Sequence, residues 1–194
     1  RIPRIRCMWR FRNSASLSAP LHTAWTMRSD PVRVKHGFPP VYDGNSKVLV
    51  LGSMPSPRSR ERGFYYMHPQ NRFWRMLAEV LGEELPADIP GRRDMCISHG
   101  VALWDVLAEC TISGASDSSI TDPVPNPLEE VFRAADIRAV FTTGKKAQAL
   151  YERFFPELPP AVCLPSTSPA NRTISEERML AEYRRIATAL ESRT

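Results

Sequence analysis

Polar groups, rigid proline turns and aromatic rings are concentrated in residues 51–74, LGSMPSPRSRERGFYYMHPQNRFW. A loop that only joins a strand to a helix needs just a few turn residues. Ser53 and Ser56 offer hydroxyl groups here, and His68 and Asn71 add further polar side chains. We therefore expect this stretch to form one wall of a binding cleft, although a Gly-Ser-x-Pro turn alone is also typical of an ordinary strand end.

Two aromatic side chains and one amide in this stretch each have two interpretations. Tyr65 or Tyr66 could stack on a planar ligand such as a base, which typically contributes ~1–3 kcal/mol, or both could pack beneath the loop. Asn71 stands where a helix is predicted to begin, so it could cap that helix. It could equally hold a water molecule or a carbonyl group in the cleft.

A single acidic residue, Asp105, interrupts the apolar run GVALWDVL at 100–107. A carboxylate is costly to bury without a partner. We therefore expect Asp105 either to lie at the mouth of a strand, facing a ligand, or to pair with a defined partner such as an arginine.

Strand-like and helix-like segments alternate along the chain. Apolar runs typical of strands occupy 46–53, 100–107, 137–144 and the start of 161–172. Helical patterns occupy 71–82, 91–100, 126–135, 145–156 and 174–192, whereas the polar segment 111–127 is predicted as a loop. The alternation predicts an α/β fold, a three-layer α/β/α sandwich with a central four-stranded parallel sheet.

Two Ser-Pro loops should meet at one edge of that sheet. GSMPSP (52–57) follows the first predicted strand and PSTSPAN (165–171) follows the fourth. Ligands of such folds bind beyond the carboxyl ends of the strands. The hydroxyl and backbone N–H groups of 165–171 suit a phosphate oxygen, and the alternative is that a serine or threonine caps the following helix.

Charge is distributed unevenly along the 194 residues. Residues 1–30 contain six arginines and one acid, whereas the other 164 residues carry 20 basic and 20 acidic groups. The basic composition is therefore no sign that the folded part binds nucleic acid, and any phosphate contact must come from local clusters such as Arg58, Arg60 and Arg62. We predict an N-terminal extension over 1–30 and one domain over 31–194.

The N-terminal segment is rich in Arg and Ser and poor in acids, as transit peptides are. The alternative is an upstream extension, with Met27 as the true start. We expect a cytoplasmic, nucleoid-associated protein in a bacterial host, with organelle targeting by residues 1–26 as the other possibility. The four cysteines form no CxxC or CxxxC pair, so we expect no zinc or iron–sulfur site. No apolar run is long enough to span a membrane.

Four segments in order, GSMPSP, HPQNRFW, GVALWDVL and PSTSPAN, resemble the uracil-DNA glycosylase superfamily, and more narrowly its DNA-deoxyinosine (hypoxanthine-DNA) glycosylase branch. The similarity runs from about residue 46 to 190. The superfamily has an Asp or Asn after the first-loop Gly, where this chain has Met54, and His or Asn before Pro-Ser, where it has Leu164. The resemblance moves the catalytic role to Asn71 and places Asp105 where uracil enzymes read the base.

The resemblance implies a monomeric repair enzyme that flips a deaminated base out of DNA and cleaves its N-glycosidic bond. Hypoxanthine is the expected base, with uracil or xanthine as alternatives, and neither a metal nor a nucleotide cofactor is needed. The base-binding residues it implies are Gly52, Ser53, Met54, Tyr65, Tyr66, His68 and Asp105. The DNA-binding residues it implies are Ser56, Arg58, Ser166, Thr167, Ser168, Pro169, Asn171 and Arg172.

Two other functions remain open from the sequence. One is a serine hydrolase in which Ser53 or Ser56 is the nucleophile and His68 the base, although no G-x-S-x-G elbow is present. The other is a nucleic-acid-binding module of the same fold without catalysis. Met54 and Leu164 favour this alternative, because they stand where the superfamily has catalytic polar residues.

Overall fold

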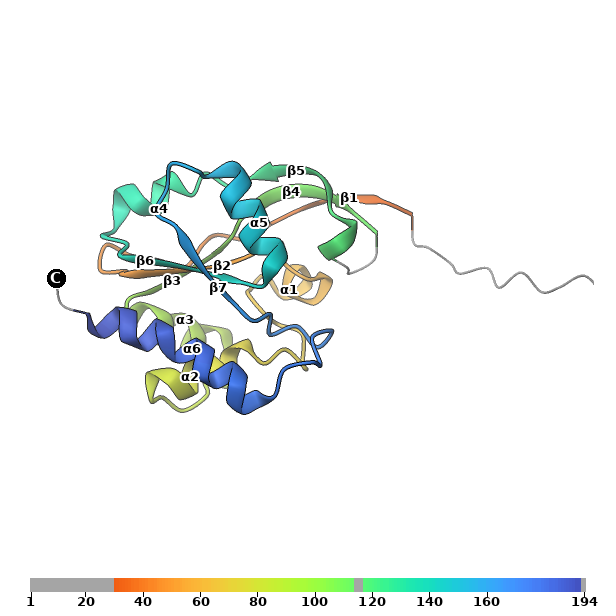
Figure 1. Cartoon of the computed structure of the whole chain (residues 1–194). Coiled ribbons are helices and arrows are strands. Elements are labelled where there is room, and N and C mark those ends of the chain that lie inside the picture. The colour runs from red at the N-terminus through yellow and green to blue at the C-terminus, as the bar shows by residue number, and fades with distance from the viewer. Residues whose placement is uncertain (1–29, 114–116, 193–194) are drawn as a thin grey trace, which may run out of the picture.

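The computed structural model describes residues 30–113 and 117–192 (Figure 1). The predicted N-terminal extension lies outside the described residues except for Asp30. Within the described part, no helix is long and apolar enough to cross a membrane.

A four-stranded parallel sheet forms the centre of the fold. Its strands, in order across the sheet, are β3 (Val101–Asp105), β2 (Val48–Gly52), β6 (Ala139–Thr143) and β7 (Ala161–Leu164). Every residue of β2 and β3 is buried, as expected for strands covered on both faces. The register places Gly52 beside Asp105, so these two strands end level with each other.

Helices cover both faces of this sheet. On one side lie α2 (Phe73–Leu81), α3 (Ile89–Ser98) and α6 (Glu176–Glu191), and on the other lie α4 (Glu129–Ala134) and α5 (Lys145–Phe154) (Figure 1). Helix α2 ends where Gly82 adopts a left-handed conformation with φ of 71°, which glycine tolerates. These layers confirm the predicted three-layer α/β fold and its four parallel strands.

A second sheet, which the sequence analysis missed, adjoins the first (Figure 1). It is antiparallel and contains β1 (Val32–Lys35), β4 (Leu107–Ile112) and β5 (Thr121–Pro125), with β4 in the middle. The prediction of a loop over 111–127 was therefore wrong. Strand β5 has the sequence TDPVP. Its two prolines made a strand look unfavourable, because within sheets proline occurs mainly in edge strands, and β5 is such an edge strand.

A short helix interrupts the long first loop. Helix α1 (Pro57–Arg62) begins after Ser56, whose hydroxyl accepts a hydrogen bond from the backbone N–H of Ser59. Proline at the first helical position and Gly63 after the last one are both typical of helix ends. A Ser-Pro pair is thus a helix start here, whereas the sequence analysis treated it only as a turn.

We expect Leu49→Ala to lower the free energy of unfolding by about 2–5 kcal/mol, because Leu49 is fully buried in β2. The control is Leu85→Ala at a side chain that is 49% exposed, which should change that free energy by less than about 0.5 kcal/mol. Urea denaturation of both variants measures the difference. Equal losses would contradict the placement of β2 at the centre of the core.

Candidate active site

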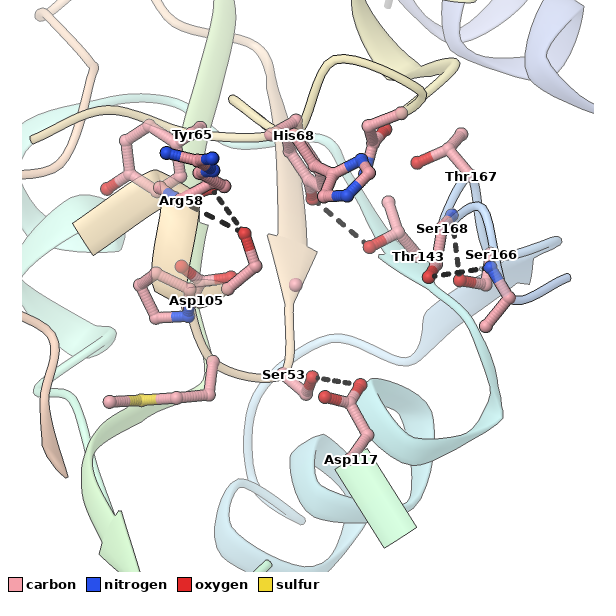
Figure 2. A pocket seen from close by; sticks show the side chains of 18 of the residues that line it. Ser53, Arg58, Tyr65, His68, Asp105, Asp117, Thr143, Ser166, Thr167 and Ser168 are labelled. Atoms are coloured by element: carbon pink, nitrogen blue, oxygen red, sulfur yellow. Dashed lines mark hydrogen bonds between the residues drawn. The ribbon is translucent and has the colours of Figure 1, made fainter. Parts of the chain in front are cut away.

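The carboxyl ends of all four parallel strands open into one pocket of about 670 Å³ (Figure 2). Gly52 ends β2, Asp105 ends β3 and Thr143 ends β6, while Ser166 follows β7 closely. The volume falls within the roughly 300–1,000 Å³ of small-molecule sites. This is the edge of the sheet at which the sequence analysis placed the cleft.

Nearly all of the predicted site residues line this pocket. They are Gly52, Ser53, Met54, Ser56, Arg58, Tyr65, Tyr66, His68, Asn71, Asp105, Ser166, Thr167, Ser168, Pro169 and Asn171. Arg172 is exposed and is not among the lining residues. Figure 2 shows Asp105 and Tyr65 on one side of the pocket and Ser166, Thr167 and Ser168 on the other. The structure thus brings together segments far apart in the sequence.

Gly52 is required because Asp105 lies directly against it. A Cβ atom added at Gly52 would be 2.1 Å from Asp105 Oδ1 and 3.3 Å from the hydroxyl of Tyr66. Any larger residue at this position would displace both groups. The final glycine of the strand therefore lets a carboxyl oxygen and a phenol approach the same part of the pocket.

Asp105 has the buried partner that the sequence analysis required, but the partner is a histidine and not an arginine. Its Oδ2 lies 2.9 Å from Nε2 of His36, which follows β1. Asp105 is 4% exposed and His36 is 5% exposed. The backbone carbonyl of Asp105 also accepts a 2.9 Å hydrogen bond from Nδ2 of Asn126. Asp105 is therefore fixed through both its side chain and its backbone.

The two adjacent tyrosines occupy different environments. Tyr65 is 1% exposed, and its hydroxyl donates to the carbonyl of Pro39. Tyr66 is only partly buried, and one face of its ring stacks on Phe73 with centroids 3.8 Å apart. Its hydroxyl is 3.1 Å from Oγ1 of Thr143. Burial, with a further contribution from Asp105, raises the pKa of Tyr66 well above its ordinary value, so Tyr66 stays a neutral phenol.

Tyr66 is also one of two non-glycine residues with positive φ in the described part of the chain, with φ of 55°. This conformation is uncommon for a bulky residue, and such strain tends to occur at functional sites. Because Tyr65 is enclosed and Tyr66 is not, Tyr66 is the better candidate for stacking on a ligand.

Asn71 makes a hydrogen bond at the start of α2, although the N-cap residue is Arg72, and its role in the cleft stays a prediction. Its Oδ1 accepts a 2.9 Å hydrogen bond from the backbone N–H of Phe73, at the start of α2. That bond fixes the amide orientation, because only the oxygen can accept from an N–H group. The Nδ2 group has no hydrogen-bond partner within the described ranges, and Asn71 lines the pocket. Asn71 therefore anchors the helix start and retains a free N–H donor.

Ser53 does not form a nucleophile–base pair with His68. Its hydroxyl donates to Oδ2 of Asp117 over 2.6 Å, as the dashed line in Figure 2 shows. His68 Nδ1 instead accepts from the backbone N–H of Gln70. The serine-hydrolase hypothesis requires a hydrogen bond from Ser53 to His68. In the described part of the chain, each of these side chains is bonded to a different group.

Asp117, from the short 3₁₀ helix Asp117–Ser119, is a pocket residue that the sequence analysis missed. The residue is exposed overall, but its carboxyl group lies against the pocket, and burial raises its pKa above the ordinary value of 3.8. The hydrogen bond from Ser53 opposes this shift, and the nearby Asp105 adds to it. A sequence rich in Ser and Asp gave no sign of which carboxylate would face the cleft.

The second Ser-Pro loop is tied to the start of α2 by Arg72. The guanidinium donates to the carbonyls of Asn171 and Ile174, over 2.7 and 3.2 Å. The side chain of Asn171 donates in turn to the carbonyl of Ser166 over 2.9 Å. Arg72 is therefore a structural clamp between the two walls of the pocket, and it is not free to bind phosphate.

The basic cluster predicted around Arg58 is partly neutralised. Arg58 pairs with Glu61 over 2.8 Å, and Arg75 pairs with Glu176 over 2.6 Å. Arg60 donates to the carbonyl of Pro55. Arg58 and Arg60 both line the pocket, so they are the cations best placed to meet a phosphate group. In the part of the chain that the structure describes, no group of three or more potential ligands could hold a metal ion.

The chain belongs to the uracil DNA glycosylase superfamily, whose family model matches residues 39–190. A hypoxanthine DNA glycosylase from Methanosarcina acetivorans is 34% identical over 148 residues, which cover 75% of this chain and 93% of the relative. A hypoxanthine DNA glycosylase from Methanosarcina barkeri is 36% identical over 115 residues, which cover 58% of this chain and 73% of the relative.

The fold is also similar to a solved structure. A solution NMR structure of a candidate uracil DNA glycosylase from Methanosarcina acetivorans has a TM-score of 0.68 and 31% sequence identity. The match covers 80% of this chain and 99% of that one. The comparisons confirm the resemblance that the four sequence segments indicated.

We expect Gly52→Ala to lower the free energy of unfolding by about 1–3 kcal/mol, because the new Cβ displaces the carboxyl group of Asp105 from His36. Gly44→Ala is the matched control, since its Cβ would meet nothing closer than the carbonyl oxygen of Ala134 at 3.7 Å. Urea denaturation compares the two variants. If both were as stable as the wild type, the close approach of Asp105 to Gly52 would be disproved.

We expect Asp117→Asn to stabilise the protein at neutral pH. The raised pKa means that folded Asp117 binds its proton more tightly than the unfolded chain does. Wild-type stability therefore falls as pH rises from about 3.8 through the folded pKa, and the Asn variant lacks this loss. Thermal unfolding between about pH 3 and pH 8 should show a stability gain that disappears at the acid end. A stability gain of the same size at every pH would contradict the raised pKa of Asp117.

Proposed function

We propose that this protein is a DNA glycosylase that extrudes a deaminated base, hypoxanthine foremost, and hydrolyses its N-glycosidic bond. The observation that carries the proposal is the convergence of Asn71 and Asp105 on one pocket in a chain of this superfamily. Two curated relatives with the name hypoxanthine DNA glycosylase support the choice of base. Uracil and xanthine are the further candidates.

A base inside a duplex is out of reach of this pocket until it leaves the stack, at a cost of a few kcal/mol. The pocket lies at the strand ends between the two Ser-Pro loops. We assign the contact with the flanking phosphate to Ser166 and Ser168 of the second loop, which line the pocket as Arg58 and Arg60 do. The extruded base would then lie between Tyr66 and the end of β3.

The thioether of Met54 neither donates a proton nor acts as a base. At this position after β2 the chain therefore lacks the acid or amide that the superfamily uses. Bond cleavage must then depend on the departure of the base and on groups that stabilise its developing charge. Asn71 supplies an N–H donor whose direction is fixed by its bond to Phe73. Hypoxanthine, a fair leaving group, suits such a site.

We expect Asn71→Ser to reduce excision by about 10²–10³-fold, the usual cost of removing one donor that stabilises the transition state. Serine can still accept from the backbone N–H of Phe73 and so retain the helix start. The assay is single-turnover cleavage of a duplex that contains one deoxyinosine, with alkali used to break the abasic strand.

The control for this substitution is Asn45→Ser, at an exposed asparagine that is not among the pocket-lining residues. It should keep the wild-type rate. Full activity of Asn71→Ser would limit Asn71 to its role at the helix start. Tight binding of the deoxyinosine duplex by the wild type, without strand scission, would instead support a non-catalytic module.

A further inference from the structure

The buried hydrogen bond between His36 and Asp105 is not explained by base excision alone. His36 lies before residue 39, where the family match begins, and it is not among the residues that line the pocket. It nevertheless has less than a tenth of its surface exposed, and its ring contacts those of Phe38 and Tyr65. Its role must therefore be exerted through Asp105, behind the pocket wall.

The hydrogen bonds of His36 determine where the proton of this pair resides. His36 Nδ1 is 2.9 Å from the carbonyl oxygen of Phe38, and a carbonyl only accepts, so Nδ1 carries a hydrogen. His36 Nε2 is 2.9 Å from Asp105 Oδ2, and one further proton must lie between these two atoms. Whether that proton belongs to Nε2 or to Oδ2, the other oxygen, Oδ1, carries none.

Oδ1 of Asp105 is the oxygen that the pocket can reach. It has no hydrogen-bond partner within residues 30–113 and 117–192, yet no side-chain oxygen or nitrogen described there is both fully buried and unpartnered. Oδ1 therefore retains contact with solvent, although Asp105 as a whole is only 4% exposed. Asp105 lines the pocket, and Oδ1 lies over the Cα of Gly52.

We propose that His36 is a specificity-determining positioning residue: it holds Asp105 so that Oδ1 faces the base as an obligatory acceptor, which selects bases with a ring N–H group. This inference rests on the proposed glycosylase function. It adds a residue outside the family match, and it states which feature of the base is recognised.

Deamination changes the feature that such an acceptor reads. Adenine has a lone pair at N1, whereas hypoxanthine has an N1–H group beside its carbonyl. Cytosine and uracil differ in the same way at N3. Oδ1 of Asp105 accepts the N–H of either deaminated base and repels the lone pair of either parent. Sites built to bind a substrate N–H can reject analogues that lack it by about 10⁴–10⁵-fold.

The second sheet positions His36 beside Asp105. The backbone N–H of His36 donates to the carbonyl of Ala108 over 2.8 Å, which continues the pairing of β1 with β4. The polypeptide passes from β3 to β4 directly after Asp105, with only Val106 between the two strands. The carboxyl group and its histidine therefore sit where the two sheets join.

The test compares two purine nucleotides in the same duplex. Deoxyinosine carries the N1–H group, whereas 2′-deoxynebularine has a lone pair at N1, no group at C6 and a smaller base that no steric clash excludes. The rate ratio of inosine to nebularine should fall at least about tenfold in His36→Leu. It should stay within about threefold of the wild type in His36→Gln, whose Nε2 can still donate to Asp105 Oδ2.

The control is His99→Leu, which breaks a half-exposed histidine–acid pair with Glu83 elsewhere on the molecule and should leave the ratio unchanged. An unchanged ratio in His36→Leu would overturn the inference. If the wild type released no base from either duplex, the proposed function would fail. The two duplexes would then be compared by fluorescence anisotropy, and the affinity ratio should show the same dependence on His36.

Asp105→Asn provides a second test in case His36→Leu does not fold. Neutral His36 keeps its hydrogen at Nδ1, so its free Nε2 accepts from the amide of Asn at position 105, and the amide oxygen still faces the pocket. The variant should excise inosine more slowly and still prefer it to nebularine. A preference for nebularine would show that His36 does not set the orientation.

Discussion

The hydrogen bond between His36 and Asp105 joins the two sheets of this protein at the point where its pocket begins. Asp105 is the last residue of a parallel strand, and its backbone carbonyl is bound by Asn126, which follows the antiparallel strand β5. Its carboxyl group meets a histidine that follows β1. Because Gly52 has no side chain, that carboxyl group can lie flat against the neighbouring strand. The chemistry of the pocket wall is thus fixed by contacts behind it.

The parallel part of the fold could be predicted because buried strands are continuous apolar runs, and the helices between them follow a period of 3.6 residues. The antiparallel part could not. Strand β5 contains the β-branched residues Thr121 and Val124, but its two prolines and its mostly exposed residues give it the composition of a loop. Helix α1 has only six residues, too few for periodicity to show, although its Ser-Pro start and Gly63 at its end were visible signals.

The site could be predicted where residues lie within two positions of a strand end, as Ser53 and Ser166 do. It could not be predicted where a side chain depends on a distant partner. His36 and Asp105 are 69 residues apart, and Ser53 and Asp117 are 64 apart. Asp105 was identified as a residue in need of a partner, because a buried charge is costly. Which residue would satisfy it depended on a strand pairing that spacing does not encode.

The clamp formed by Arg72 has a consequence for how a damaged base is found. Its guanidinium holds two backbone carbonyls of the opposite wall, and charged hydrogen bonds of this kind are roughly twice as strong as neutral ones. These bonds connect the two walls of the pocket in the free protein, so a duplex that binds with them intact would itself take up the distortion. A pocket of fixed width would capture whichever nucleotide leaves the stack most often. Discrimination would then begin with the opening kinetics of mismatched pairs, ahead of any contact with the base itself.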